Sequence, residues 1–374
     1  MDSHDAYQLK MMERVEGLTF PLISGIARKV MPKQSDCFQQ WFDAVEQVGD
    51  HVGIRFGFIA PGRKDPEWKF LSHAKVDGIG GFAEVLRSNG AHLPELPRIK
   101  LSSPVSGRAL LRYWPKYLAP RTSLNWTLPN QTKADGVPVP QACSWHLFDE
   151  KQTSQIRRVC WQLGITVNSF LVHHLTHAVR PDLEKPNAVV PWLIPVNMRG
   201  GVKRERDTDN HSSYVSIRVF PTDPIHQTHQ QILDKIEKGE HWANWYAYQL
   251  GRCATAGIRQ LLVAKELCFA QWNLGAFSNL GNWDPDKRLS GSGIVGDWLF
   301  CPPVLKTQKM AAGCVTFQGR LSLMTQAHAM LTTDVNVTNG WIQNWVQSIE
   351  TNLRNIVGEE KGAPRLSIVN PLAA

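Results

Sequence analysis

The sequence predicts an α/β protein in which mixed sheets are covered by helices and divided between two lobes. Short segments with the alternating apolar pattern of strands are interspersed with longer segments of helical spacing. The 374 residues are more than one compact core usually needs. A proline-rich stretch over 89–140 lacks clear periodicity and is typical of a connector, so we expect an N-terminal lobe at 1–140 and a C-terminal lobe at 141–374.

The elements of the N-terminal lobe follow from periodicity and from helix end signals. Apolar residues alternate in the expected strands, and recur at helical spacing in the expected helices. Asn89-Gly90 supplies a helix stop. A long crossover loop is expected at 120–140. The expected elements are strands at 51–59 and 68–71, and helices at 36–49, 82–88 and 108–118.

The C-terminal lobe shows the same alternation over a longer stretch. Asp149 and Thr166 are suitable caps for two consecutive helices. The aromatic segment 241–248 has three interpretations: a lid over a tunnel, a contact with lipid, or packing in the core. The expected elements are strands at 143–148, 188–199, 212–220 and 275–281, a hairpin at 315–327, and helices at 149–164, 166–179, 224–238 and 335–357.

A motif whose residues could take part in catalysis lies between the strand at 68–71 and the following helix. His73 can act as a general base near neutral pH, because the unperturbed pKa of histidine is about 6.5. Asp77 can orient the imidazole or brace the turn that carries it. Gly78, Gly80 and Gly81 allow a sharp turn or the close approach of another group. The alternative is that His73 is a buried histidine that caps a turn.

His73-Ala-Lys-Val-Asp77-Gly78 resembles the HxxxDG signature of the CoA-dependent acyltransferase superfamily. This superfamily includes chloramphenicol acetyltransferases, nonribosomal peptide condensation domains, wax ester synthases and polyketide-associated acyltransferases. Many members carry an additional histidine directly before the motif histidine, at the position where this chain has Ser72. The DFGWG element of the plant branch is missing, which favours the bacterial and fungal branches.

Further short motifs follow in the order that the superfamily has them, over about residues 50–330. The start of the helix at 166–169 resembles a TVND element, and the strand end at 195–199 resembles a PVNLR element. The resemblance implies that Arg199 pairs with Asp77 across the lobe junction; the alternative is a surface arginine. Ser278 and Asn279 match an SN-x-G element and are candidate oxyanion donors. The hairpin at 315–327 also resembles one in these families.

The resemblance implies a chloramphenicol acetyltransferase-like fold with a tunnel at the lobe junction. In that fold His73 would deprotonate a hydroxyl or amine acceptor, which then attacks an acyl thioester of CoA or of an acyl carrier protein. His73, Asp77 and Gly78 would form the catalytic motif, without a metal or a tightly bound cofactor. Two alternatives stay open: a condensation-type enzyme that forms amide bonds in a biosynthetic pathway, and a non-catalytic binding module of the same fold.

Composition narrows the function classes. Hydrophobic residues make up 43% and charged residues 20%, as in an ordinary globular protein. The chain has no apolar run long enough for a transmembrane helix and no secretory signal, and its seven cysteines form no CxxC pair, so we expect reduced thiols and a cytoplasmic location. The net charge of +8 is dispersed, which argues against nucleic-acid binding and suits a phosphate-bearing acyl donor.

Three histidines of one expected helix invite a metal interpretation. His173 and His177 are four residues apart and share a helix face, as zinc ligands do, and His174 lies beside them. No acidic residue accompanies them as in HExxH, and no third ligand is apparent. The preferred interpretation is therefore a buried helix whose histidines have hydrogen-bond partners.

Overall fold

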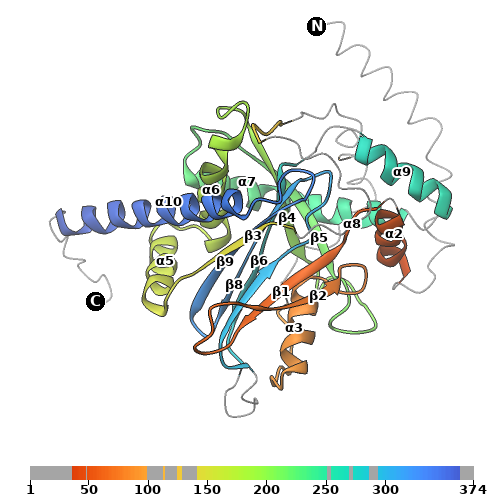
Figure 1. Ribbon diagram of the computed structural model, residues 1–374, viewed down its shortest axis with the longest axis horizontal. Helices are drawn as coiled ribbons and strands as arrows, with labels where there is room; N and C mark the ends of the chain where they lie inside the picture. Colours follow the sequence, from red (N-terminus) through yellow and green to blue (C-terminus); the bar gives the residue numbers. More distant parts are fainter. Residues whose placement is uncertain are drawn as a thin grey trace, which may run out of the picture.

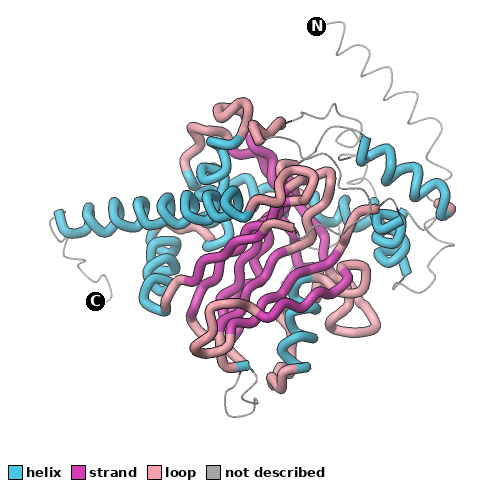
Figure 2. The backbone as a smooth tube through the Cα atoms, viewed as in Figure 1, coloured by secondary structure: helices cyan, strands magenta, loops and turns pink. Residues whose placement is uncertain are grey.

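The computed structural model describes residues 36–47, 49–98, 113, 124–128, 141–250, 254–268, 273–285 and 294–362. Its strands lie at the centre of the molecule and its helices surround them (Figure 2). The predicted α/β class is confirmed. The expected helix at 108–118, the expected loop at 120–140 and the lobe boundary at residue 140 fall mostly or wholly outside the described residues, so the division into two lobes stays a prediction.

The smaller sheet is antiparallel and has the order β2-β1-β7. Its first two strands are β1 (Gly53–Ile59) and β2 (Glu67–Ser72), as expected from alternation. Its third strand, β7 (Asp297–Cys301), comes from the far end of the chain and pairs with β1 over Arg55–Ile59. The N-terminal strands are thus completed by a C-terminal one.

The larger sheet is mixed and has the order β3-β9-β8-β6-β4-β5. β8 pairs in parallel with β6, and β6 with β4, whereas the outer pairs are antiparallel. The hairpin of β8 and β9 is almost wholly buried, including the polar side chains of Ser322, Thr325 and Gln326. The strands are β3 (Cys143–Leu147), β4 (Val190–Asn197), β5 (Ser212–Val219), β6 (Gly275–Trp283), β8 (Met310–Phe317) and β9 (Arg320–Ala327).

Side-chain caps fix where three of the helices begin. Asp77, Asp149 and Thr166 each accept a hydrogen bond from a backbone N–H in the first turn of their helix. The last helix runs longer than expected, and α9 was not expected at all. The helices are α2 (Asp36–Gln47), α3 (Gly78–Ser88), α5 (Glu150–Gln162), α6 (Val167–Val179), α7 (Ile225–Glu237), α8 (Glu240–Leu250), α9 (Ala256–Cys268) and α10 (Val335–Gly362), and a short 3-10 helix covers Arg180–Asp182 (Figure 1).

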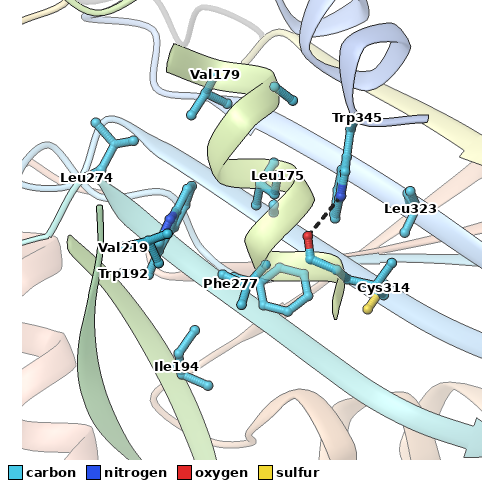
Figure 3. Packing of buried hydrophobic residues seen from close by; sticks show 14 of the residues in the cluster. Leu175, Val179, Trp192, Ile194, Val219, Leu274, Phe277, Cys314, Leu323 and Trp345 are labelled. Atoms are coloured by element: carbon cyan, nitrogen blue, oxygen red, sulfur yellow. Dashed lines mark hydrogen bonds between the residues drawn. The ribbon is translucent and has the colours of Figure 1, made fainter. Parts of the chain in front are cut away.

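The main core lies between the larger sheet and helices α6 and α10 (Figure 3). Phe277 of β6 packs against Trp345 of α10, and the indole of Trp345 donates a hydrogen bond of 3.0 Å to the carbonyl of Leu171. The aromatic segment 241–248 lies in α8. Trp242 and Trp245 are buried in this core, so the packing interpretation holds for this part of the segment.

Candidate active site

The loop between β2 and α3 carries His73, whose backbone N–H and carbonyl groups are both hydrogen-bonded. The N–H of His73 donates a hydrogen bond of 2.9 Å to the carbonyl of Val52, beside the start of β1. The side-chain amide of Asn210 donates a bond of 2.7 Å to the carbonyl of His73. Asn210 lies two residues before β5 of the other sheet, so both sheets position the His73 loop.

The His73 imidazole is fixed in one tautomer by its surroundings. Its Nδ1 lies 2.9 Å from the carbonyl oxygen of Val76, closer than the amide nitrogen of Asn210 at 3.4 Å, which donates its shorter bond of 2.7 Å to the His73 carbonyl. A carbonyl can only accept, so Nδ1 carries the hydrogen and Nε2 of the neutral ring carries the lone pair. The ring of Phe42 lies 4.8 Å away, centroid to centroid. Burial lowers the pKa of His73, and the hydrogen bond to Val76 and the charge of Asp77 only partly oppose this effect. The ring is therefore neutral at neutral pH.

The hydrogen bonds of Asp77 indicate a structural role for its side chain. Its carboxylate accepts a bond of 2.7 Å from the N–H of Gly80, as the cap of α3, and another of 2.7 Å from the N–H of His211. It also accepts two bonds, of 2.8 and 2.9 Å, from the guanidinium of Arg199. These four donors occupy the acceptor sites of both carboxylate oxygens. Asp77 therefore holds the motif loop, and the His73 imidazole is hydrogen-bonded to the Val76 carbonyl instead.

Arg199 lies just after β4, and all five N–H groups of its guanidinium donate hydrogen bonds. Its two bonds to Asp77 form a bidentate pair, and the side chains of both residues are about one-twentieth exposed or less. Its three other N–H groups donate to the carbonyls of Asp207 and Asp209 and to the amide oxygen of Asn197. The structure thus brings Asp77 and Arg199 together, 122 residues apart in sequence.

The motif glycines are required by packing and not by a left-handed turn, since none of the three has a positive φ angle. A Cβ on Gly80 would lie 2.0 Å from the carbonyl oxygen of Thr208. A Cβ on Gly78 would lie 2.8 Å from a methyl of Leu280 and 3.0 Å from the ring of Phe300. Of the two expectations for these residues, the close approach of another group is the one that the structure shows.

A cavity of about 140 Å³ lies beside His73, between the two sheets. Ser278 lines this cavity, on the same face of β6 as Ala276. Asn279 points elsewhere, and its amide oxygen accepts a hydrogen bond of 2.8 Å from the N–H of Gly281. Most of the lining is apolar or aromatic. The complete lining consists of Phe38, Phe42, Ile54, His73, Gly78, Leu193, Pro195, Ser212, Ser213, Tyr214, Tyr248, Ala276, Ser278, Phe300, Pro302, Pro303, Leu305 and Gln308.

Sequence reasoning did not identify most of this lining, nor Asn210. These residues lie in seven different elements, and no local pattern distinguishes them from ordinary core positions. The alternation of β4 was the one usable signal. It places Leu193 and Pro195 on one face and Trp192, Ile194 and Val196 on the other, although it does not tell which face meets a cavity.

Two of the three histidines of α6 are hydrogen-bonded through Nδ1, whereas Nε2 of His174 is buried without a hydrogen-bond partner. Nδ1 of His173 lies 3.1 Å from the hydroxyl of Thr228, and Nδ1 of His174 lies 2.8 Å from that of Ser348. The rings of His173 and His177 are 4.8 Å apart. Within the described residues, no group of three His, Cys, Asp or Glu side chains is arranged to hold a metal ion.

Two further expectations concern charge and membranes. In the basic cluster 203–206, Arg206 pairs with Asp209 at 2.9 Å and with Glu84 at 3.4 Å, so part of its charge is neutralised locally. Among the described residues, no helix combines the length and the apolarity needed to cross a bilayer.

Comparison with known proteins supports the fold. No protein-family model and no curated sequence matches the chain. The epimerization domain from the third module of tyrocidine synthetase B is 14% identical, with a TM-score of 0.51 over 87% of this chain and 78% of that one. The trichothecene 15-O-acetyltransferase from Fusarium sporotrichioides is 12% identical, with a TM-score of 0.51 over 86% of this chain and 76% of that one.

A third similar structure is the cyclization-docking bidomain of a peptide synthetase, EpoB, from Sorangium cellulosum. It is 10% identical, with a TM-score of 0.50 over 77% of this chain and 61% of that one. At these identities the likeness concerns the fold alone. The chain therefore has the chloramphenicol acetyltransferase-like fold that condensation-type domains and acetyltransferases share.

Proposed function

We propose that this protein is an acyltransferase that moves an acyl group from a CoA or carrier-protein thioester to a hydroxyl or amine, with His73 as general base. The observation that carries the proposal is the fixed tautomer of His73 beside the cavity. The Val76 carbonyl occupies Nδ1, so the lone pair is on Nε2. Burial lowers the pKa of His73, so this lone pair is available at neutral pH.

In the proposed reaction, Nε2 of His73 accepts the proton of the acceptor hydroxyl or amine as its oxygen or nitrogen attacks the thioester carbonyl. The tetrahedral intermediate then expels the thiolate, which takes the proton from the imidazolium. A positioned base typically contributes about 10² to 10⁴-fold to the rate. Asp77 and Arg199 have no direct part, because their hydrogen-bonding groups are saturated by each other and by the backbone.

Ser278 is the better of the two candidate oxyanion donors. It lines the same cavity as His73, whereas the amide oxygen of Asn279 is engaged by the following turn. Among the described residues, no hydrogen-bond partner of the Ser278 hydroxyl is found, so its proton is free to turn to a substrate. Loss of one oxyanion donor typically costs about 3 to 4 kcal/mol in the transition state.

The size of the cavity supports a short group beside His73. Its volume of about 140 Å³ is close to that of an engineered cavity of about 150 Å³ that binds benzene. Its apolar lining favours an aliphatic or aromatic group of similar size over a charged one. We therefore expect the enzyme to prefer short apolar groups at this position.

A condensation-type enzyme that joins an amine to a carrier-bound acyl group is the second candidate. It is favoured by the fold shared with the epimerization and cyclization-docking domains of peptide synthetases. Both candidates use the same base and differ in the donor and the acceptor. A non-catalytic binding module would keep the cavity and show no acceptor-dependent turnover.

Thiol release separates these possibilities. The protein is incubated with acyl-CoAs from acetyl to palmitoyl, or with an acylated carrier protein, together with mixed alcohols and amines. The proposal predicts thiol release that depends on an acceptor and is lost in His73→Ala but kept in His51→Ala, an exposed histidine just before β1. Absence of acceptor-dependent release with every donor would reject an acyltransferase and favour the binding module.

A further inference from the structure

Arg55 is a buried arginine on the face of β1 opposite the cavity. Its neighbour Ile54 lines the cavity beside His73, whereas Arg55 is 9% exposed and lies beside Cys143 of β3, the edge strand of the larger sheet. None of the ion pairs found among the described residues includes Arg55. Its Nε–H is buried without a hydrogen-bond partner.

The groups around Arg55 supply no negative charge. The rings of Trp68 and Phe70 lie 5.2 and 5.1 Å from the guanidinium carbon. The thiol of Cys143 is hydrogen-bonded to the Arg55 side chain, and the thiol of Cys301 lies close enough for its pKa to respond to the charge of Arg55. Burial raises the pKa of both thiols even though Arg55 opposes the shift, so they stay protonated at neutral pH.

An arginine in this position calls for a counter-charge. The guanidinium is never deprotonated in proteins, and burying a charge without a partner is strongly unfavourable. The rings of Trp68 and Phe70 offset part of this cost, since a cation is attracted to the face of an aromatic ring. The remaining deficit distinguishes Arg55 from Arg199, whose five donors are all used.

We propose that Arg55 is the centre of a binding site for one anionic group, a phosphate or a carboxylate. Its Nε–H and an adjacent terminal N–H form the planar fork that binds two oxygens of such a group. The entrance is at Phe70, which is 57% exposed on the edge strand β2 and covers the guanidinium. Rotation of this ring admits the anion. The site does not depend on the proposed acyl transfer.

Thermal shift and calorimetric titration of the whole chain test this site. The probes are inorganic phosphate, CoA and succinate, which separate a free phosphate, a phosphate on a thioester donor and a carboxylate. At least one probe is expected to raise the melting temperature of the wild type. Arg55→Met should weaken its binding at least tenfold, Arg55→Lys should weaken it less, and Phe70→Ala should preserve or tighten it. Arg218→Met, at an exposed arginine of β5, is the matched control for the general positive charge.

Stability without ligand provides an independent readout. If Arg55 is an unpaired charge that awaits an anion, Arg55→Met should leave the melting temperature of the free protein unchanged or raise it, because a buried charge is replaced by an apolar side chain of similar length. A wild type that no probe stabilises, equal binding by Arg55→Met and wild type, or a free Arg55→Met protein that is unfolded or much less stable would each overturn the proposal.

Discussion

Substitution of Asp77 by asparagine should destabilise the whole protein, and the structure gives the magnitude. Asparagine keeps one acceptor oxygen and replaces the other with an NH₂ group, so at least two of the four hydrogen bonds to this side chain are lost. The Arg199 guanidinium is then left charged in a site where both side chains are about 95% buried. Breaking one partner of such a pair typically costs about 3 to 5 kcal/mol.

Urea unfolding of Asp77→Asn, Arg199→Met and the double variant measures this loss and the coupling between the two residues. Both single variants should be strongly destabilised, and the double variant should lose less than their sum, because both changes break the same contact. Thiol release should fall together with stability, since the loop that carries His73 loosens. The control is Arg87→Met, which breaks an exposed pair with Asp207 and should cost about 0.2 to 1 kcal/mol.

Two results would refute this reasoning. Full additivity of the two single variants would mean that Asp77 and Arg199 do not act as one unit. Loss of turnover in Asp77→Asn with unchanged unfolding free energy would mean that Asp77 acts on the chemistry directly.

Three further predictions concern pH and metals. Because burial lowers the pKa of His73, kcat/KM should be flat from about pH 7 upward and should fall only at a pH below the ordinary histidine value of about 6.5; a plateau that begins well above pH 7 would contradict the assigned environment. Burial lowers the pKa of His173 to about 4 and of His174 to about 3, so the unfolded chain binds protons there before the folded chain does. Stability should therefore fall as the pH drops from about 6.5 toward 3, and His174→Leu should reduce this slope in urea unfolding at several pH values; an unchanged slope would show that His174 is not responsible. Chelators should leave turnover and the melting temperature unchanged; destabilisation that zinc reverses would show a metal at His173 and His177.

Local sequence patterns predicted the elements that build the His73 loop. A half-buried strand, a capped helix and an aspartate four residues after the histidine are all readable within about twenty residues, and the structure forms them as β2, Asp77 and α3. The expected pairing of Arg199 came from the resemblance, and the structure joins the two residues with two hydrogen bonds.

Long-range arrangement was the part that the sequence did not reveal. β7 pairs with β1 from more than 200 positions away, and neither strand carries a signal for its partner. The positioning contacts of His73 with Phe42 and Asn210 also join distant segments. Arg55 illustrates the same limit, since its alternating position in β1 does not reveal whether a carboxylate faces it.

The most direct test of the central claim is a comparison of acceptor-dependent thiol release by wild type and His73→Ala, with folding checked by urea unfolding. The variant should fold with nearly unchanged stability, because the His73 side chain borders a cavity, and its turnover should fall at least about 10²-fold. Turnover above about 10% of the wild type in a folded His73→Ala protein would contradict the role of His73 as general base.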